Sequence, residues 1–422
     1  MATATASRTT TQTIAPTSRA DVPDAVRAAY EASQAVYPIG GGTALDNGIA
    51  ASQPGIQLDL TSLAKIVDYT PRDMTILVEA GVRMADLAAT LAAESQHLPI
   101  DVPRASEATI GGVVATNWSG SRRYGYGTIR DYVIGIHAVD GRGVAFKGGG
   151  RVVKNVAGYD FCKLLTGSLG TLGVITQLAF KLKPLPETSA TLVAACADLA
   201  TADILLESFV NLAAPPIAID YLAGPGWKTP TAISGQQSEI RSDTSHLVIR
   251  VEGTPAETDW LADRIQSEMW RGGGMNVARL ATTDADALWR QQVEFADRGA
   301  GDVPDDSPLV VKIAVPASAA TKLILPILAF DPACAIQAHA GNGIIIARFS
   351  KFSHGDLTTV LVGKLRPAAV GLGGSLVVVS SKLDGLTPHL VWGGRTEAIE
   401  LMGRIKQKFD PRGILNPGRF IY

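Results

Sequence analysis

PRASEATIGGVVATNWSGSRRYGYG, residues 103–127, opens the stretch that decides the fold of this chain. Two further glycine-rich segments complete it, KGGGRVVKNVAGYD at Lys147–Asp160 and GSLGTLGVIT at Gly167–Thr176. Glycine clusters of this density place the backbone at positive φ or in close approach to another group. A long cofactor whose phosphates lie along the main chain requires such approach, whereas a packed core does not. Unrelated tight turns between strands are the alternative, and the gathering of several clusters in one stretch favours the cofactor.

Composition limits the classes of function. The chain has 422 residues, a formal net charge of −2 and 46% hydrophobic residues, as expected for two or three globular domains. This balance excludes a strongly basic protein that binds nucleic acid or an anionic membrane by charge alone. The three cysteines, Cys162, Cys196 and Cys334, are far apart and form no metal-binding pattern. We therefore predict buried reduced thiols, no metal site and no iron–sulfur cluster in this chain.

The N-terminal segment predicts neither a signal peptide nor an anchor. Residues 1–20 are rich in Ala, Thr and Ser and have no apolar region, so we expect a flexible tail. No stretch approaches the roughly 20 apolar residues of a membrane span. We expect a soluble, cytoplasmic protein that associates with a membrane only through partner subunits.

The first part of the chain alternates strands and helices. Strands are predicted at Val36–Ile39, Gly55–Leu60 and Met74–Gly81, and helices at residues 24–33 and at Met84–Ser95. The first strand ends in Gly40, Gly41, Gly42 and Thr43, a turn whose N–H groups can surround a diphosphate. It is not a P-loop, because no Gly-Lys-Ser/Thr follows. These features predict a small α+β domain.

The GSLGTLG run is similar to a dinucleotide fingerprint and has to be tested as one. A Rossmann loop needs a strand before the glycines and a helix after them. Here FCKLL before the run is predicted as a helix, and VITQLAFKLKP after it alternates like a strand. The order is inverted, which counts against a nicotinamide-binding Rossmann domain.

The motifs together resemble a family. The chain is similar to FAD-linked oxidoreductases of the vanillyl-alcohol oxidase / p-cresol methylhydroxylase (PCMH) type, and within that superfamily it most resembles the E subunits of glycolate oxidase (glycolate dehydrogenase). The resemblance covers most of residues 36–184 and the last thirty residues. It rests on PIGGGT, GGVVATN, RYGYG, KNVAGYD, GSLGTLGVIT and FDPRGILNPGR (Phe409–Arg419).

The resemblance implies an FAD site built largely from backbone and small side chains. FAD would be non-covalent, because no histidine precedes His97, whereas many members link it through a histidine near the first loop. The implied cofactor-binding residues are Gly40, Gly41, Gly42, Thr43, Pro103, Thr109, Gly111, Gly112, Ala115, Asn117, Gly120, Gly125, Gly170, Gly173, Val174, Ile175 and Asn416. For Val174 and Ile175 a core strand is the alternative, and for Asn416 a C-terminal turn that docks on the core.

The resemblance also implies the domain order and an α+β fold class. We predict a flexible tail at 1–20, a PCMH-type FAD-binding domain of two α+β subdomains at 21–186, a cap domain at 187–394 and a segment at 395–422 that returns to the FAD domain. The cap would be an antiparallel sheet with helices on one face. Strands are predicted at Leu247–Gly253 and Leu309–Pro316.

The cap carries an incomplete version of the substrate motif. Catalytic relatives have HAGDGNLH and an SGEHG-type segment, whereas this chain has HAGNGIII at His339–Ile346 and GGSLVVVSSKLDG at Gly373–Gly385. The Asp is replaced by Asn342 and the second His by Ile346. His339 and Arg348 remain as catalytic candidates, and a structural role is the alternative for each.

Three hypotheses follow. First, the chain is an FAD-binding accessory or electron-relay subunit of a complex that oxidises glycolate to glyoxylate, beside a homologous catalytic flavoprotein and an iron–sulfur subunit. Second, it is a self-sufficient FAD-dependent dehydrogenase of 2-hydroxy acids such as D-lactate. Third, it is a scaffold without catalysis. An absorption spectrum of the purified chain distinguishes them.

Overall fold

The computed structural model describes residues 10–49, 51, 53–150, 158–210, 212, 214–227, 245–298, 306–394 and 397–420. Residues 151–157 of the Lys147–Asp160 motif therefore lie outside the described chain. The protein divides into two compact units: unit 1 comprises residues 1–119, 128–185 and 387–422, and unit 2 comprises residues 120–127 and 186–386. No helix within the described ranges is both long and apolar enough to cross a membrane.

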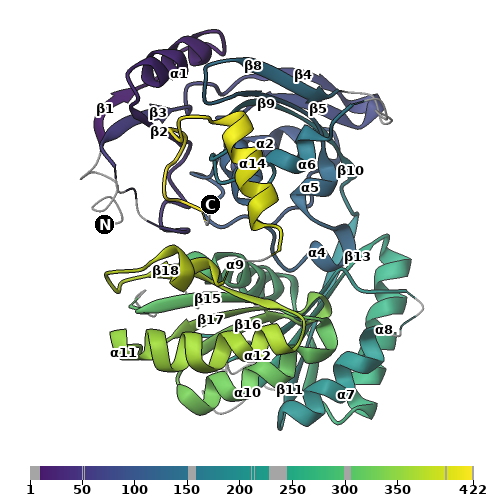
Figure 1. The fold of residues 1–422 in the computed structure, drawn as a ribbon. Coiled ribbons are helices and arrows are strands. Elements are labelled where there is room, and N and C mark those ends of the chain that lie inside the picture. The colour runs from purple at the N-terminus through teal and green to yellow at the C-terminus, as the bar shows by residue number, and fades with distance from the viewer. Residues whose placement is uncertain are drawn as a thin grey trace. The chain divides into compact units, whose positions relative to one another are not determined.

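Unit 1 begins with a small parallel sheet, in the order β1-β3-β2. Its strands are β1 (Thr10–Ile14), β2 (Ala35–Ile39) and β3 (Gly55–Asp59), and α1 (Asp21–Glu31) packs beside them (Figure 1). The expectation of a flexible tail up to residue 20 is wrong for β1, which pairs with β3. The strand is stabilised by pairing with β3, about 45 residues further along the chain, and its own composition does not predict a strand.

A five-stranded antiparallel sheet forms the second part of unit 1, in the order β4-β5-β9-β7-β8. Its strands are β4 (Ile66–Thr70), β5 (Thr75–Glu79), β7 (Val133–Val139), β8 (Ala145–Gly149) and β9 (Val174–Lys181), with β6 (Gln96–His97) and β10 (Lys183–Pro184) as a separate pair. The helices of unit 1 are α2 (Met84–Ala92), α3 (Ile110–Thr116), α5 (Ile129–Tyr132), α6 (Phe161–Leu165), α13 (Pro388–Trp392) and α14 (Ile399–Phe409), and η2 (Pro71–Asp73) is a 3₁₀ turn. The predicted order of α6 before β9 is confirmed, and Met84–Ser95 forms a helix that ends three residues earlier, at Ala92.

Unit 2 is built on one antiparallel sheet of eight strands, in the order β14-β11-β13-β12-β16-β17-β15-β18. The strands are β11 (Thr188–Cys196), β12 (Ala218–Ala223), β13 (Ser245–Gly253), β14 (Met275–Arg279), β15 (Leu309–Ala314), β16 (Ala335–His339), β17 (Ile344–Phe349) and β18 (Ser375–Ser381). Its helical segments are α4 (Arg123–Tyr126), α7 (Leu199–Val210), α8 (Pro255–Arg271), α9 (Thr282–Arg298), η3 (Ala317–Ala319), α10 (Ala320–Phe330), η4 (Ala340–Asn342), α11 (His354–Asp356), the π-helical η5 (Leu357–Leu365) and α12 (Arg366–Gly371). The antiparallel sheet that we expected is confirmed.

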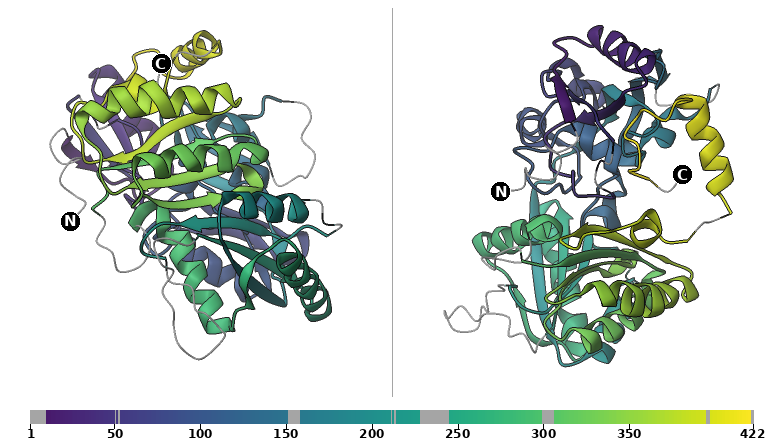
Figure 2. Two further views of the ribbon diagram at one scale, coloured as in Figure 1. Left: turned by 90° about the horizontal axis from the view of Figure 1, so that it is seen from below. Right: turned by 60° about the vertical axis from the view of Figure 1, so that its left-hand side comes forward.

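Helices cover both faces of this sheet, so the expectation of a single covered face is wrong. Neighbouring residues of β17 show this, because consecutive side chains of a strand point to opposite faces. Phe349 makes an aromatic contact with Phe330 of α10, whereas Arg348 donates to the Phe295 carbonyl oxygen of α9. Figures 1 and 2 show the same separation of α9 from α10. The face that carries Arg348 also carries the polar residues described below.

Candidate functional site

In unit 1 the glycine turn after β2 lies directly against the segment that leads into α3. A Cβ on Gly40 would lie 2.0 Å from Thr109 Oγ1, and a Cβ on Gly41 would lie 1.7 Å from the carbonyl oxygen of Glu107. The two predicted cofactor segments, residues 40–43 and 103–117, are therefore in backbone contact. Thr43 follows in the same half-buried turn. The turn remains partly open to a ligand on its other side.

Helix α3 presents one glycine inward and the next outward. Gly111 is buried, and its N–H donates to the Ala80 carbonyl oxygen at 2.8 Å. Gly112 is exposed, and a Cβ there would meet only Thr109 Oγ1, at 3.4 Å. Packing explains Gly111. It does not explain Gly112, where the absence of a side chain leaves the helix backbone open to a flat ligand.

The end of α3 meets the GSLG segment. The N–H groups of Gly167 and Leu169 donate to the carbonyl oxygens of Val114 and Ala115, at 2.9 and 2.8 Å. Both Leu169 and Asn117, the residue after α3, have left-handed backbone, with φ of 53° and 52°. Backbone in this region costs a non-glycine residue free energy and is found preferentially at ligand sites.

Unsatisfied polar atoms gather in the same part of unit 1. Asn117 Oδ1, Ser119 Oγ and Ser168 Oγ are buried and have no hydrogen-bond partner among the described residues. Each buried unpaired polar group costs about 1–3 kcal/mol, so a ligand that pairs with them is strongly favoured. The residues present thus fit FAD: Asn117, Ser119 and Ser168 would hold it by polar side chains, and residues 40–43 and Gly112 by backbone.

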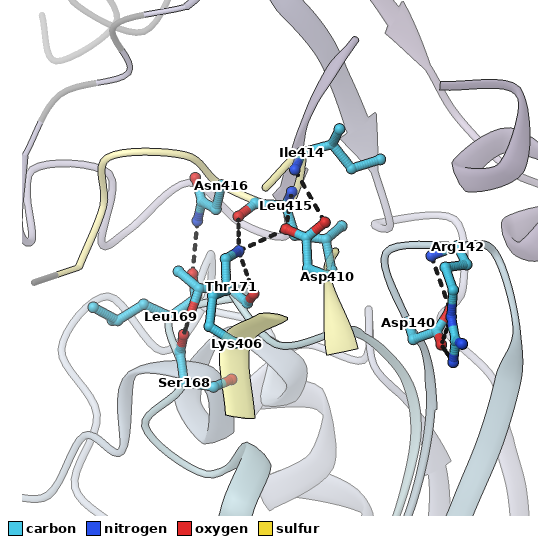
Figure 3. Close-up of polar contacts among 10 residues, drawn as sticks. All are labelled: Asp140, Arg142, Ser168, Leu169, Thr171, Lys406, Asp410, Ile414, Leu415 and Asn416. Atoms are coloured by element: carbon cyan, nitrogen blue, oxygen red, sulfur yellow. Dashed lines mark hydrogen bonds and ion pairs between the residues drawn. The ribbon is translucent and has the colours of Figure 1, made fainter. Parts of the chain in front are cut away.

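The C-terminal segment completes unit 1 at this point (Figure 3). Asn416 donates from Nδ2 to the Leu169 carbonyl oxygen at 2.6 Å, and its N–H donates to Val36 of β2 at 2.8 Å. Lys406 donates from Nζ to Asp410 at 2.6 Å and to the Thr171 carbonyl oxygen at 2.7 Å. Burial lowers the pKa of Lys406, and Asp410 opposes that shift. Asn416 therefore positions the GSLG segment.

A second C-terminal residue holds the loop that follows the glycine turn. Arg419 donates from Nη1 to the carbonyl oxygens of Leu45 and Ile49, at 2.7 and 3.1 Å. Burial lowers the pKa of this guanidinium, while Asp46 and Tyr37 act in the opposite direction. The C-terminal motif FDPRGILNPGR thus holds two segments in place: the loop after the glycine turn and the GSLG segment.

The remaining predicted cofactor residues divide into three groups. Ala115 lies on α3, Pro103 on the segment before it, and Gly170, at φ +69°, lies beside Pro38 and Asn416. Gly173 packs near Val139, and Val174 and Ile175 are 0% and 5% exposed in β9, so their side chains belong to the core and only their main chain can face a cofactor. Gly120 and Gly125 belong to unit 2, where a Cβ on Gly125 would lie 2.7 Å from Ile217.

Unit 2 buries a polar cluster at the end of β16. Asp220 Oδ1 lies 3.0 Å from His339 Nδ1, and Asp220 Oδ2 accepts hydrogen bonds from Ser121 Oγ at 2.5 Å and Gln337 Nε2 at 3.0 Å. All four side chains are buried. Because a carboxylate can only accept, we assign the ring proton of His339 to Nδ1, which leaves a lone pair on Nε2. No described residue bonds to that nitrogen.

This cluster is not a hydrolase triad. Ser121 Oγ and Asp220 both approach the same ring nitrogen of His339, at 3.3 and 3.0 Å. In a Ser-His-Asp triad the serine and the carboxylate contact different nitrogens. The arrangement instead orients an imidazole and keeps Nε2 ready to accept a proton or another electrophile.

Arg348, the other catalytic candidate, has partners on helix α9. Its Nη1 donates to the carbonyl oxygens of Phe295 and Ala296, at 3.2 and 2.9 Å, and its guanidinium lies over the Phe295 ring. Cations commonly bind the last carbonyl groups of a helix in this way. These contacts describe a residue that attaches α9 to β17.

Sequence reasoning missed the residues that form the polar face of unit 2. Asp220 stands in the apolar strand AIDYLA, and Lys312 stands in LVVKIAV. A charged residue in an otherwise apolar buried strand is rare unless it is paired or functional, and this signal could have found both. Ser121, from the glycine-rich segment, could not be assigned to Asp220 without the tertiary structure.

Comparisons with known proteins agree with the geometry of unit 1. Residues 10–149 match the family described as FAD binding domain, and residues 389–420 match the family described as FAD linked oxidases, C-terminal domain. A solved structure of alkyldihydroxyacetonephosphate synthase aligns with 96% of this chain and 76% of its own, with a TM-score of 0.66 and 18% identity. The predicted PCMH-type fold and FAD as cofactor are confirmed.

Two curated relatives bear on the function. Glycolate oxidase subunit GlcD of Bacillus subtilis is 27% identical over 403 residues, which cover 91% of this chain and 83% of that protein. Glycolate oxidase subunit GlcE of Escherichia coli is 40% identical over 139 residues, which cover 33% of this chain and 40% of that protein. Identity is thus higher to the second protein, and coverage is greater with the first.

Proposed function

We propose that this FAD-linked oxidoreductase, whose cofactor is FAD, is the FAD-binding subunit of a complex that oxidises glycolate, a 2-hydroxy acid, to glyoxylate. In this complex it acts as an accessory or electron-relay flavoprotein, beside a homologous catalytic flavoprotein and an iron–sulfur subunit. The similarity to subunits GlcD and GlcE supports a role in such an assembly. Non-covalent attachment of FAD, and any association with a membrane through the partners, belong to the same proposal.

One observation carries the proposal: unit 1 has elements that fit FAD, whereas the polar face of unit 2 has one imidazole where the resemblance implies two. His339 pairs with Ile344 across β16 and β17, so Ile346, two residues further, points to the same face as His339. A methyl-bearing side chain there can neither ligate a metal nor move a proton. The polar face of unit 2 therefore lacks one of the two imidazoles that the resemblance implies for a catalytic subunit, whereas unit 1 keeps the motifs of an FAD-binding domain.

Oxidation of a 2-hydroxy acid requires particular groups from the cofactor and from the protein. FAD, when bound, supplies a two-electron acceptor for the hydride that leaves Cα of the hydroxy acid. The protein has to take the hydroxyl proton and hold the carboxylate. His339 Nε2 can take a proton, because Asp220 fixes the ring through Nδ1 at 3.0 Å.

This same pair supports a second candidate, a self-sufficient FAD-dependent dehydrogenase of 2-hydroxy acids such as D-lactate. An oriented imidazole with a free lone pair is one of the groups that such an enzyme needs. In this case the chain alone would complete the reaction, and Asp220 would be a positioning residue for His339.

An absorption spectrum of the purified chain separates the candidates. The spectrum is recorded anaerobically before and after addition of glycolate, then D-lactate, and finally the homologous catalytic flavoprotein with glycolate. We expect flavin bands that persist with either acid alone and bleach when the partner is present.

Bleaching by glycolate or D-lactate alone, at the rate of the complete complex, would refute the relay role and establish the autonomous enzyme. A colourless protein that gains no thermal stability from added FAD would refute both, because a ligand that binds the folded state raises its stability by mass action.

A further inference from the structure

Lys312 is a half-buried cation on the polar face of unit 2. It lies in β15, where Ile346 of β17 and Val377 of β18 are its cross-strand neighbours. Gln337 lies opposite Ile346 on β16, so Lys312, Ile346 and Gln337 form one row across the sheet. Burial, and in second place the charge of Arg123, lowers the pKa of Lys312. No described acidic side chain pairs with its ammonium group.

Arg123 reaches this face from another part of the chain. It begins α4. Ser121, just before this helix, bonds to Asp220, and the Tyr124 ring within it lies against Gly341. The Gly125 N–H also donates to the Ile217 carbonyl oxygen at 3.0 Å, just before β12. Three separate contacts therefore hold the segment that carries Arg123 on unit 2. Ser121 of this segment also accepts from Gln337, which lies in the same row across the sheet as Lys312.

The nearby carboxylates are engaged with other partners. Asp220 accepts from His339, Ser121 and Gln337. Glu252, whose side chain is 2% exposed, accepts from Arg250 at 2.9 Å and from Tyr126 at 2.9 Å. Lys312 and Arg123 thus form a pair of like charges with no counterion among the described residues. Like charges that are partly removed from water repel each other, and an anion between the two would offset this repulsion.

Lys312 and His339 are close enough to act on one small molecule. They lie on strands separated by β17, and neighbouring strands are about 4.8 Å apart, so their backbones are about 10 Å apart across the strands. His339 lies two residues beyond Gln337, which adds about 7 Å along the strands. Both side chains project from the same face, because Lys312 pairs with Ile346 and His339 with Ile344. The long lysine side chain can shorten this separation.

We propose that Lys312 and Arg123 form a binding site for the carboxylate of a small organic anion on the face of unit 2 that carries His339. The site itself follows from the two unpaired cations, and its assignment to a 2-hydroxy acid rests on the proposed function. Lys312 would bind the anion as a point charge, and Arg123 as a planar donor. Neither residue belongs to the FAD-binding elements of unit 1.

Oxalate, a dicarboxylate that cannot be oxidised by hydride transfer, is the probe. Its binding to the FAD-loaded protein is measured by isothermal titration calorimetry for wild type, Lys312→Met, Arg123→Gln and the control Lys322→Met, which removes an exposed lysine of α10 on the opposite side of the sheet. We expect each site variant to weaken binding by about 10-fold or more, and the control to leave it unchanged.

A second readout does not depend on affinity. Oxalate should protect Lys312 from acetylation by acetic anhydride, whereas the acetylation of Lys322 should be the same with and without oxalate. Mass spectrometry measures both. Lys312→Met should also raise the melting temperature of the ligand-free protein, because it replaces a half-buried charge, which has no acidic partner among the described residues, by an apolar chain of similar length.

Equal oxalate affinity in all four proteins, or no oxalate binding to wild type, would overturn the site. A stable Lys312→Met protein that retains its flavin and still binds oxalate would do the same. Failure of the proposed function is distinguishable, because oxalate binding to Lys312 can persist in a protein whose flavin glycolate never reduces, with or without the partner.

Discussion

The two units present their polar groups in opposite ways. In unit 1 the candidate cofactor site is made of main chain, glycine and a few unpaired side-chain atoms, Asn117 Oδ1, Ser119 Oγ and Ser168 Oγ among them. In unit 2 the polar face is made of charged side chains. Asp220 holds His339 there, and Lys312 has no acidic partner in the described part of the chain. The first arrangement suits a long anionic cofactor, and the second suits a small charged molecule.

The difference teaches which changes each unit tolerates. A site built from backbone fails when a Cβ is added, because the main chain cannot move aside. A site built from side chains fails when a charge or a hydrogen-bond acceptor is removed, while its backbone persists. Four predictions test this contrast, from the largest expected effect to the smallest.

Gly41→Ala should have the largest effect. The new methyl group would lie 1.7 Å from the Glu107 carbonyl oxygen, so the glycine turn has to separate from the segment before α3. We expect a loss of about 3 kcal/mol in the free energy of unfolding and a protein without flavin. Urea unfolding and the flavin-to-protein absorbance ratio measure both. Wild-type flavin content in this variant would contradict a backbone-built site.

Asp220→Asn should leave the flavin in place and destabilise unit 2. The amide cannot accept from His339, Ser121 and Gln337 together, so at least one buried donor loses its partner. The expected cost is about 2 kcal/mol in urea unfolding, and nitrogen NMR should show His339 losing its Nδ1–H tautomer. Asp306→Asn, at an exposed ion pair with Lys382, is the control and should change stability little. Loss of flavin from Asp220→Asn would remove the contrast between the units.

Acidification should weaken unit 2 through His246. Burial lowers the pKa of this histidine from 6.5 to about 4. Below pH 6.5 the unfolded chain therefore binds a proton that the folded chain does not, so the stability is complete above pH 6.5 and is lost as the pH falls toward 4. Between pH 7 and pH 5 we expect a loss of about 2 kcal/mol from this group. His246→Phe should reduce the pH dependence by that amount, measured by urea unfolding at both pH values, and the exposed His354→Gln should leave it unchanged. An identical slope in His246→Phe and wild type would exclude His246 as the cause.

Gly112→Ala should have the smallest and most diagnostic effect. The methyl group meets no atom closer than 3.4 Å and replaces glycine in a helix, so the FAD-free protein should gain about 0.5–1 kcal/mol. FAD affinity, measured by fluorescence titration, should nevertheless fall, because the methyl group would occupy the surface against which we expect the cofactor to lie. A more stable protein with unchanged FAD affinity would contradict the prediction that the cofactor lies against α3.

Some elements could be predicted because their signals are local. The inverted order of α6 before β9 was visible in FCKLL and in the alternation of VITQLAFK, and the glycine turn after β2 in three consecutive glycines. Strand β1 and the position of α9 could not be predicted. Both depend on partners far along the chain, β3 for the strand and Arg348 for the helix, and no residue within them specifies that partner.

The sequence by itself identified FAD as the cofactor and predicted a site built from backbone, because glycine requirements act within a few residues and leave a local pattern. It also showed that the substrate motif is incomplete at Asn342 and Ile346. Only the tertiary structure decided that Asp220 holds His339, across 119 positions of the chain, and that Lys312 and Arg123 have no acidic partner among the residues that the structure describes. The reason is physical: the register of an antiparallel sheet sets which side chains share a face, and this register is a property of the whole sheet.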